Sequence, residues 1–276
     1  MSAGLASTAA AGAVGLLAGS FLGVCAERLP QRRSVVSPGS RCPACQRPLS
    51  PAENLPLLGY LWLRGRCRAC HSPIPIRDLW IEAGAGLAFA WAWFVAGPGI
   101  EFVRLAFFLA CLLTLAATDI EFRQLPDELT LGGWLAGLAL AAWVHPGAFG
   151  AAQPGLASAL TASFGGAGLL AAVGLGYQRW RGREGLGWGD VKMTGLLGAF
   201  LGVQALLTAL LLASVAGALV GLGQAGAILL NRRHRGRSWR QARASSAVFL
   251  ARAALPFGLF LAIGAAAALT AGWRIV

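Results

Sequence analysis

The chain is poor in charge, and above all in acidic residues. Only 12% of its 276 residues are charged and 57% are hydrophobic, whereas soluble globular proteins carry about 25% charged residues. This composition excludes a water-soluble globule, and it also excludes a disordered chain because disorder requires low hydrophobicity. The sequence holds 11 acidic side chains, so each of them can be weighed for a structural or a functional role.

Several common catalytic motifs are missing as well. The sequence contains no GxSxG nucleophile elbow, no HExxH zinc-protease motif and no GxxxxGK[ST] phosphate-binding loop. Serine hydrolase, zincin and nucleoside triphosphatase functions therefore lack support.

Apolar stretches long enough to cross a bilayer as helices, about 20 residues each, recur along the chain. They run over 4–26, 79–96, 102–118, 126–144, 156–178, 191–230 and 254–273. The stretch over 191–230 is twice the needed length, so we expect two helices in it with a break near 211–215. The predicted fold is an all-α polytopic membrane protein of about eight transmembrane helices.

The net charge of +12 is distributed as an orientation signal. With eight spans, 21 of the 23 Lys and Arg residues fall on one face of the membrane. The two exceptions are Arg104 and Arg274. Loops rich in Lys and Arg stay cytoplasmic, so both termini are expected outside. The first span has no Lys or Arg before it and is longer than the apolar region of a signal peptide, so we expect it to remain uncleaved.

The predicted domains are a first transmembrane helix over 1–26, a cytoplasmic four-cysteine module over 27–78 (the cysteine module) and a transmembrane core of about seven helices over 79–276. The basic run over 231–243 is interpreted as topology and contact with anionic lipid, with RNA binding as the lesser alternative. The lipid bilayer is thus an expected partner, and nucleic acid is not.

Four of the six cysteines form two CxxC pairs, Cys42–Cys45 and Cys67–Cys70. This spacing lets both thiolates of a pair reach one tetrahedral ion, and two pairs complete a structural zinc site. Disulfides are disfavoured by the predicted cytoplasmic location, a redox CxxC pair is a further alternative, and His71 is an alternative ligand. Because four thiolates leave no open position for water, the zinc is expected to be architectural rather than catalytic.

Asp119 stands at the end of the third apolar stretch, directly after residue 118. It is followed by Glu121, Pro126, Asp127 and Glu128. A proline followed by two acidic residues is typical of a helix start, so Asp127 and Glu128 have a structural explanation. Asp119 has none, because a carboxylate at the C-terminus of its own helix faces the unfavourable end of the helix dipole.

Asp190 opens the long sixth stretch, in the run Gly187-Trp-Gly189-Asp190-Val-Lys192. A helix N-cap would explain Asp190, but the two glycines exceed what a cap needs and would let another helix or a substrate backbone approach closely. The predicted topology places Asp119 and Asp190 at the same membrane edge. Two aspartates at matching depth on different helices are what a carboxylate dyad requires.

Acidic residues at membrane depth usually have a function, and these residues alone leave three alternatives open. The first is an aspartyl protease, and the second is a proton- or cation-coupled transporter that uses the same two aspartates. A transporter predicts acids nearer the bilayer midplane and usually inverted repeats. The third, a zinc-dependent membrane adaptor without catalysis, would tolerate loss of either aspartate.

Over nearly its whole length the chain resembles the bacterial type IV prepilin peptidases, or leader peptidases. The resemblance rests on the segment 20–30, on the cysteine module with its run from Asn54 to Tyr60, on 119–127, and on Gly187-Trp-Gly-Asp190. The last run fits the GxGD pattern shared with presenilin-like intramembrane aspartyl proteases. Gly23 departs from the family pattern, which usually has Asn there, in a segment associated with methylation.

The resemblance implies an aspartic endopeptidase of the bacterial cytoplasmic (inner) membrane, with Asp119 and Asp190 as its catalytic pair. Its expected substrates are type IV prepilins or type II secretion pseudopilins, cut after a glycine in a short basic leader. It also implies N-methylation of the new N-terminus with S-adenosylmethionine as methyl donor. Supporting roles around the pair are expected for Glu121, Pro126, Asp127, Gly187, Gly189 and Lys192.

Two nearby carboxylates cannot both ionise cheaply, so the pair is expected to share one proton. From helix ends alone, Asp190 at a helix N-terminus should be the ionised general base that activates water. Asp119 at a helix C-terminus should hold the proton and polarise the scissile carbonyl.

Overall fold

The computed structural model describes residues 4–143, 154–183, 185–234 and 256–273, and in these ranges the chain is helical without a β-strand. The helices are α1 (Leu5–Arg28), α2 (Leu58–Trp62), α3 (Ile76–Ala96), α4 (Ile100–Phe122), α5 (Asp127–Trp143), α6 (Leu156–Arg181), α7 (Trp188–His234) and α9 (Phe257–Trp273). Five of them, α1, α3, α4, α6 and α7, are long and apolar enough to cross a membrane, and α9 is a shorter apolar helix. The predicted class of an all-helical polytopic membrane protein is confirmed.

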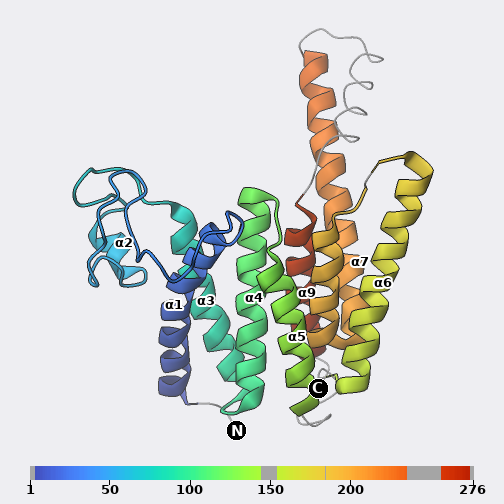
Figure 1. Cartoon of the computed structure of the whole chain (residues 1–276), viewed down its shortest axis with the longest axis horizontal. Helices are drawn as coiled ribbons and strands as arrows, with labels where there is room; N and C mark the ends of the chain where they lie inside the picture. The colour runs from blue at the N-terminus through green and yellow to red at the C-terminus, as the bar shows by residue number, and fades with distance from the viewer. Residues whose placement is uncertain (1–3, 144–153, 184, 235–255, 274–276) are drawn as a thin grey trace.

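The cysteine module lies at one end of the helix bundle, beside the end of α1 and the start of α3 (Figure 1). We call this the module end, and the opposite end, where α1 begins and α9 finishes, the far end. The predicted positions 235–243 and Arg274 lie outside the described residues. Arg104, one of the two basic residues predicted outside the cytoplasmic loops, lies inside α4 with Glu101, and both are buried.

α7 is interrupted at Gly202, whose φ of 72° and ψ of −178° belong to a region that is essentially restricted to glycine. A Cβ atom at this position would lie 2.8 Å from Pro154 Cβ and 2.9 Å from Ser158 Oγ, at the start of α6. The break predicted near 211–215 is therefore wrong, because those residues are helical and the interruption lies at Gly202.

The first arm of α7, residues 188–201, runs in the same direction as α5. Gly133 faces Leu196 and Gly137 faces Phe200, so positions advance together along both helices. Since α5 starts at the module end, the first arm descends from the module end to the far end.

The second arm of α7, residues 203–234, runs antiparallel to α9. Gly217 faces Phe260, whereas Gly264 faces Ala213, so positions advance in opposite directions. Since α9 starts at the module end (Figure 1), the second arm returns there. The chain thus reverses at Gly202, and the two helices expected within 191–230 are present with a displaced break.

The buried core gathers around α4, the first arm of α7 and α9. Its fully enclosed side chains include Phe108, Leu115, Leu196, Leu197 and Leu261. α4 packs on α1, α3, α5 and α9, while α7 packs on α5, α6 and α9. The helices that carry Asp119 and Asp190 are therefore supported by the same central layer.

Candidate functional site

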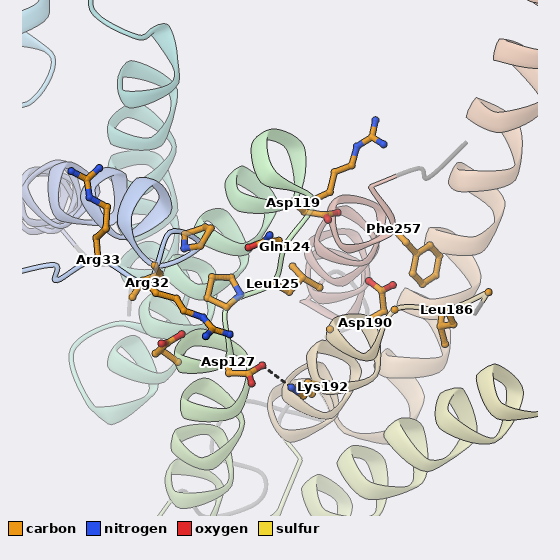
Figure 2. A pocket seen from close by; sticks show the side chains of 18 of the residues that line it. Arg32, Arg33, Asp119, Gln124, Leu125, Asp127, Leu186, Asp190, Lys192 and Phe257 are labelled. Atoms are coloured by element: carbon orange, nitrogen blue, oxygen red, sulfur yellow. Dashed lines mark hydrogen bonds and ion pairs between the residues drawn. The ribbon is translucent and has the colours of Figure 1, made fainter. Parts of the chain in front are cut away.

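A cavity of about 1110 Å³ opens at the module end and is lined by both Asp119 and Asp190 (Figure 2). The predicted supporting residues that line the same cavity are Pro126, Asp127, Gly187, Gly189 and Lys192. Glu121, the remaining predicted supporting residue, is not part of the lining. The structure thus brings together two acidic segments that are separated by about 70 positions in the sequence.

Asp119 lies in the last turn of α4 and is only 6% exposed. Its Oδ2 accepts a hydrogen bond of 2.9 Å from the backbone N–H of Leu259, in the first turn of α9. A Cβ on Gly258 would lie 3.0 Å from the same oxygen, so a glycine allows this close approach. The positive end of the α9 dipole therefore faces the carboxylate, a contact that sequence reasoning missed because it joins positions 140 residues apart.

Asp190 lies in the first turn of α7 and is half-buried, close enough to Asp119 for their charges to interact. Each of the two glycines before Asp190 leaves room for a different neighbouring group. A Cβ on Gly187 would lie 3.3 Å from Asp190 Oδ2, and one on Gly189 would lie 3.1 Å from Leu125 Cβ. Gly189 thus leaves room for the Leu125 side chain of the segment that joins α4 to α5; close approach of another helix or of a substrate backbone stays a prediction.

An ion pair connects the starts of α5 and α7 at the cavity. Lys192 Nζ lies 2.7 Å from Asp127 Oδ1 (Figure 2). Asp127 also occupies the first turn of α5, directly after Pro126, where the helix dipole favours a carboxylate. The pair therefore holds the helix that carries Asp190 against the helix that follows Asp119.

The segment after α1 forms a cavity wall that the sequence did not reveal. Leu29, Pro30, Arg32, Arg33 and Ser34 all line the cavity. Arg32 has a φ of +54°, and its side chain extends into the cavity on the side of Asp127 (Figure 2). The chain entering the cysteine module is therefore part of the site.

Glu121 belongs to a charge network beside the cavity rather than to the cavity itself. Arg77 of α3 lies 2.5 Å from Glu121 of α4, 3.0 Å from Asp78 and 3.4 Å from Glu27 of α1. One guanidinium thus joins three carboxylates from three helices at the module end. Glu27 and Asp78 are both ion-paired with Arg77.

The four cysteines of the two CxxC pairs converge at a single point. Their Sγ atoms all lie within 4.8 Å of one another, with Cys42 and Cys70 at 3.7 Å and Cys45 and Cys67 at 4.0 Å. Four tetrahedral zinc–sulfur bonds of about 2.3 Å would place sulfurs about 3.8 Å apart. The geometry fits one tetrahedral metal ion, while all six cysteines are free of disulfides.

The two CxxC pairs have the same local backbone. Cys42 N–H donates to Arg47 O and Cys67 N–H to Ser72 O, and the residue after each pair, Gln46 or His71, has a positive φ. Backbone N–H groups, first that of Cys70, lower the pKa of the Cys67 thiol to about 6, whereas burial raises the pKa of the neighbouring Cys70 thiol to about 11. His71 is not part of the ligand cluster.

Two partly buried carboxylates hold the cysteine module together and against the bundle. Glu53 accepts hydrogen bonds from Ser50 N–H at 2.8 Å and Arg47 at 2.6 Å. Glu82 Oε2 of α3 accepts a hydrogen bond of 2.8 Å from the N–H of Leu57. Leu57, within the run from Asn54 to Tyr60, therefore ties the module to α3.

The sequence matches two family descriptions that together cover most of the chain. Residues 13–96 match the bacterial peptidase A24 N-terminal domain, and residues 106–222 match the type IV leader peptidase family. The first match covers α1, the cysteine module and α3. The second covers α4 to most of α7, including both aspartates.

Several curated relatives are named prepilin leader peptidase/N-methyltransferase. The one from Myxococcus xanthus is 40% identical over 76% of this chain and 60% of its own length. The relative from Burkholderia pseudomallei is 37% identical over 89% of this chain and 71% of its own length. The relative from Klebsiella pneumoniae is 39% identical over 73% of this chain and 88% of its own length. No solved structure shows significant similarity to the chain.

Proposed function

Since the chain belongs to the type IV leader peptidase family, we propose that it is a membrane-embedded aspartyl endopeptidase that removes the basic leader of type IV prepilins or pseudopilins. The observation that carries this proposal is the meeting of Asp119 and Asp190, from two helices, in one cavity at the module end. Two neighbouring carboxylates of which one is ionised can activate water and polarise a peptide carbonyl.

The hydrogen bond to Asp119 bears on which carboxylate is ionised. The first turn of α9 offers Asp119 a backbone N–H, and hydrogen bonds to the charged form favour ionisation. We therefore assign the base to Asp119 and the shared proton to Asp190, the reverse of the assignment expected from helix ends alone. The proton is a property of the pair, so this describes its dominant arrangement.

In this mechanism Asp119 takes a proton from a water molecule, and the water oxygen bonds to the scissile carbonyl carbon. Asp190 gives its proton to the carbonyl oxygen. When the tetrahedral intermediate collapses, the carbon–nitrogen bond breaks, the leaving nitrogen receives the proton from Asp119, and Asp190 regains its own. The two carboxylates are then ready for another cycle.

The location of the cavity supports a defined membrane arrangement. The protein is a membrane protein, and we assign it to the bacterial inner membrane with the cysteine module cytoplasmic and both termini outside. α1 begins and α9 finishes at the far end, while the cavity and the module share the other end. A substrate helix entering from the bilayer with a cytoplasmic leader would place its cleavage site at the cavity.

The cysteine module is proposed to hold a structural zinc ion through Cys42, Cys45, Cys67 and Cys70. Zinc bound there would fix the fold of a module too small for a large core of its own. Because all four ligands are thiolates, none of the residues in the dyad cavity is needed to bind the ion. Catalysis is accordingly assigned to the aspartates.

N-methylation of the new N-terminus, with S-adenosylmethionine as methyl donor, is proposed as the second activity because the relatives are named for both. The residues that the structure describes form no parallel β-sheet, so a Rossmann-type donor site is not built there. At Gly23, a Cβ would lie 3.6 Å from Asp78 Oδ1, so the Asn usual at this position would face Asp78. Methylation would appear as a mass increase of about 14 Da on the mature pilin, a measurement that also reports cleavage.

The transporter alternative gains no support from the placement of the acids. Asp119 lies in the last turn of α4 and Asp190 in the first turn of α7, at one end of the bundle. A proton relay through the bilayer would be expected nearer the middle of the helices.

The peptidase proposal is tested by incubating the purified protein with a prepilin and following leader removal by mass spectrometry. Asp119→Asn and Asp190→Asn should each lower the cleavage rate by several orders of magnitude, since each removes one member of the dyad. Glu27→Gln is the matched control, because it removes a carboxylate at the module end that does not line the cavity. Cleavage at the wild-type rate by either aspartate variant would contradict the assignment.

A further inference from the structure

Arg104 is a charged side chain buried at the far end of α4, about four turns before Asp119. It is 4% exposed, and Glu101 in the preceding turn is 7% exposed. A buried charge is costly unless hydrogen-bond partners and an opposite charge compensate it. Its partners therefore indicate why an arginine is placed there.

Arg104 caps the first arm of α7. Its Nη2 donates hydrogen bonds of 3.3 Å to the carbonyl oxygens of Ala199 and of Phe200. These carbonyls belong to the last turn before the break at Gly202, where a helix leaves its carbonyls without intrahelical partners. A guanidinium at this position satisfies them and complements the negative end of the helix dipole.

Aromatic contacts reinforce the same connection. The ring of Phe200 stacks on that of Phe108 of α4, with centroids 4.7 Å apart and planes at 17°. The Arg104 guanidinium also lies over the Phe200 ring, 5.8 Å from its centroid. We call Arg104, Phe108 and Phe200 the far-end clamp, because they join α4 directly to the end of the first arm.

The two helices joined by the far-end clamp are those that carry the catalytic pair. Asp119 is at the module end of α4, and Asp190 is at the module end of the first arm. Fixing the opposite ends of two stiff helices limits how far they can slide or rotate relative to one another. The far-end clamp thereby constrains the separation of the two carboxylates.

We propose that Arg104 is a positioning residue of the peptidase: it fixes the first arm of α7 to α4, so that Asp190 stands opposite Asp119. This inference rests on the proposed function. The position of Asp190 matters for the rate, because a displacement of about 1 Å at a catalytic group can lower the rate about a hundredfold.

Arg104→Gln should lower kcat for leader cleavage by about 10- to 100-fold per folded molecule and leave KM within a few-fold of the wild type. Because the shared proton depends on the proximity of the carboxylates, the pH dependence of kcat should also change shape. Arg104→Lys keeps the charge without the planar fork and should be intermediate. Phe200→Leu, which removes the stacking but not the carbonyls, provides a second variant should Arg104→Gln not fold.

Phe102→Ala is the matched control. Phe102 packs on Phe89 and Trp93 of α3, so its loss loosens the contact of α4 with α3 and keeps the hydrogen bonds of Arg104 to Ala199 and Phe200. Phe102→Ala should lower the stability of the protein and the amount of active enzyme, and it should leave the shape of the pH dependence of kcat unchanged. An Arg104→Gln enzyme with the wild-type kcat, or with a pH profile of unchanged shape, would overturn the positioning role.

A measurement independent of catalysis separates this inference from the peptidase proposal. Spin labels on Arg123→Cys and Trp188→Cys, two exposed positions at the module end, report the separation of α4 and the first arm. Arg104→Gln should broaden or shift this distance distribution, and Phe102→Ala should not. A distribution unchanged by Arg104→Gln refutes the clamp, whereas absence of prepilin cleavage by the wild type refutes only the peptidase proposal.

Discussion

At the scale of single residues, the site depends on how closely a backbone can approach a carboxylate. Gly258 stands where any larger residue would place its Cβ 3.0 Å from both Asp119 Oδ2 and Leu125 Cδ2. The hydrogen bond from Leu259 N–H requires this proximity. A glycine is needed here for close packing and not for an unusual backbone conformation, since Gly258 lies in an ordinary helix start.

Gly258→Ala should therefore lower kcat for prepilin cleavage by about 10-fold or more, because the methyl group displaces the base from its N–H donor. The variant should insert and fold, since alanine is a good helix former. Steady-state kinetics per folded molecule provides the measurement. Gly132→Ala is the control, a helical glycine with open space around it, and equal rates for both variants would contradict the role assigned to Gly258.

A second residue-scale prediction concerns pH and the cysteine module. The N–H of Ser50 and then the Arg47 guanidinium lower the pKa of Glu53 from 4.5 to about 2. A depressed pKa in the folded state means that Glu53 stabilises the module above its ordinary pKa and loses this effect as the pH falls from about 4.5 towards 2. Glu53→Gln should accordingly release metal to a chelator faster than the wild type at pH 7.

The chelator competition is followed by absorbance at pH 7, where the Glu53 carboxylate is ionised. Glu27→Gln, a carboxylate outside the module core, serves as the control and should match the wild type throughout. A Glu53→Gln protein that releases metal at the wild-type rate at pH 7 would show that this carboxylate does not hold the module.

At the scale of whole elements, the reversal within α7 determines the position of Asp190. The break lies at Gly202 because a glycine-only backbone conformation is combined with close contact to Pro154 and Ser158 at the start of α6. An even division of the apolar stretch would have put the break near 211–215. The second arm is much longer than the first, so the assumption that the stretch divides into two helices of equal length was wrong.

Gly202→Ala should destabilise the protein by about 1–3 kcal/mol from backbone strain, with a further cost from the clash at 2.8 Å with Pro154. Thermal unfolding in detergent measures the difference. Gly226→Ala lies in the helical second arm with nothing near its added methyl and should be neutral or slightly stabilising. A Gly202→Ala protein as stable as the wild type would mean that the reversal does not require the glycine.

The sequence could supply the local part of this architecture and site but not the long-range part. Pro126 and Asp127 marked the start of α5 correctly, and the motifs around Asp119 and Asp190 identified residues that meet in one cavity. The N–H of Leu259 and the wall formed by Arg32 could not be foreseen. Both are contacts between distant segments, and neither leaves a periodic or spacing signal in the sequence.

At the scale of the whole molecule, the cysteine module and the dyad cavity are separate sites joined by a short segment. The thiolate cluster lies within the module, while the residues directly after α1, Leu29 to Ser34, contribute a wall of the cavity. Zinc bound by the proposed cysteine ligands would therefore act on the proposed peptidase by ordering that wall and not by contact with the reacting atoms.

Cys67→Ser should reduce bound zinc from about one ion per chain and lower the stability of the module, because structural zinc contributes folding free energy. The fraction that remains folded should still cleave a prepilin. Metal analysis and leader cleavage on the same preparation test this, with Cys25→Ser as a control for a cysteine outside the cluster. Unchanged zinc content in Cys67→Ser would contradict the ligand assignment.

The hydrogen bond between Leu259 and Asp119 also has a consequence for biosynthesis. The ribosome makes Asp119 and Asp190 well before it makes α9, whose first turn lies 140 residues beyond Asp119. A nascent chain therefore carries both aspartates in the membrane while its base still lacks its orienting donor. On the proposed function, the nascent chain would therefore cleave slowly until the last helix has inserted, and the full cleavage rate would follow the completion of α9.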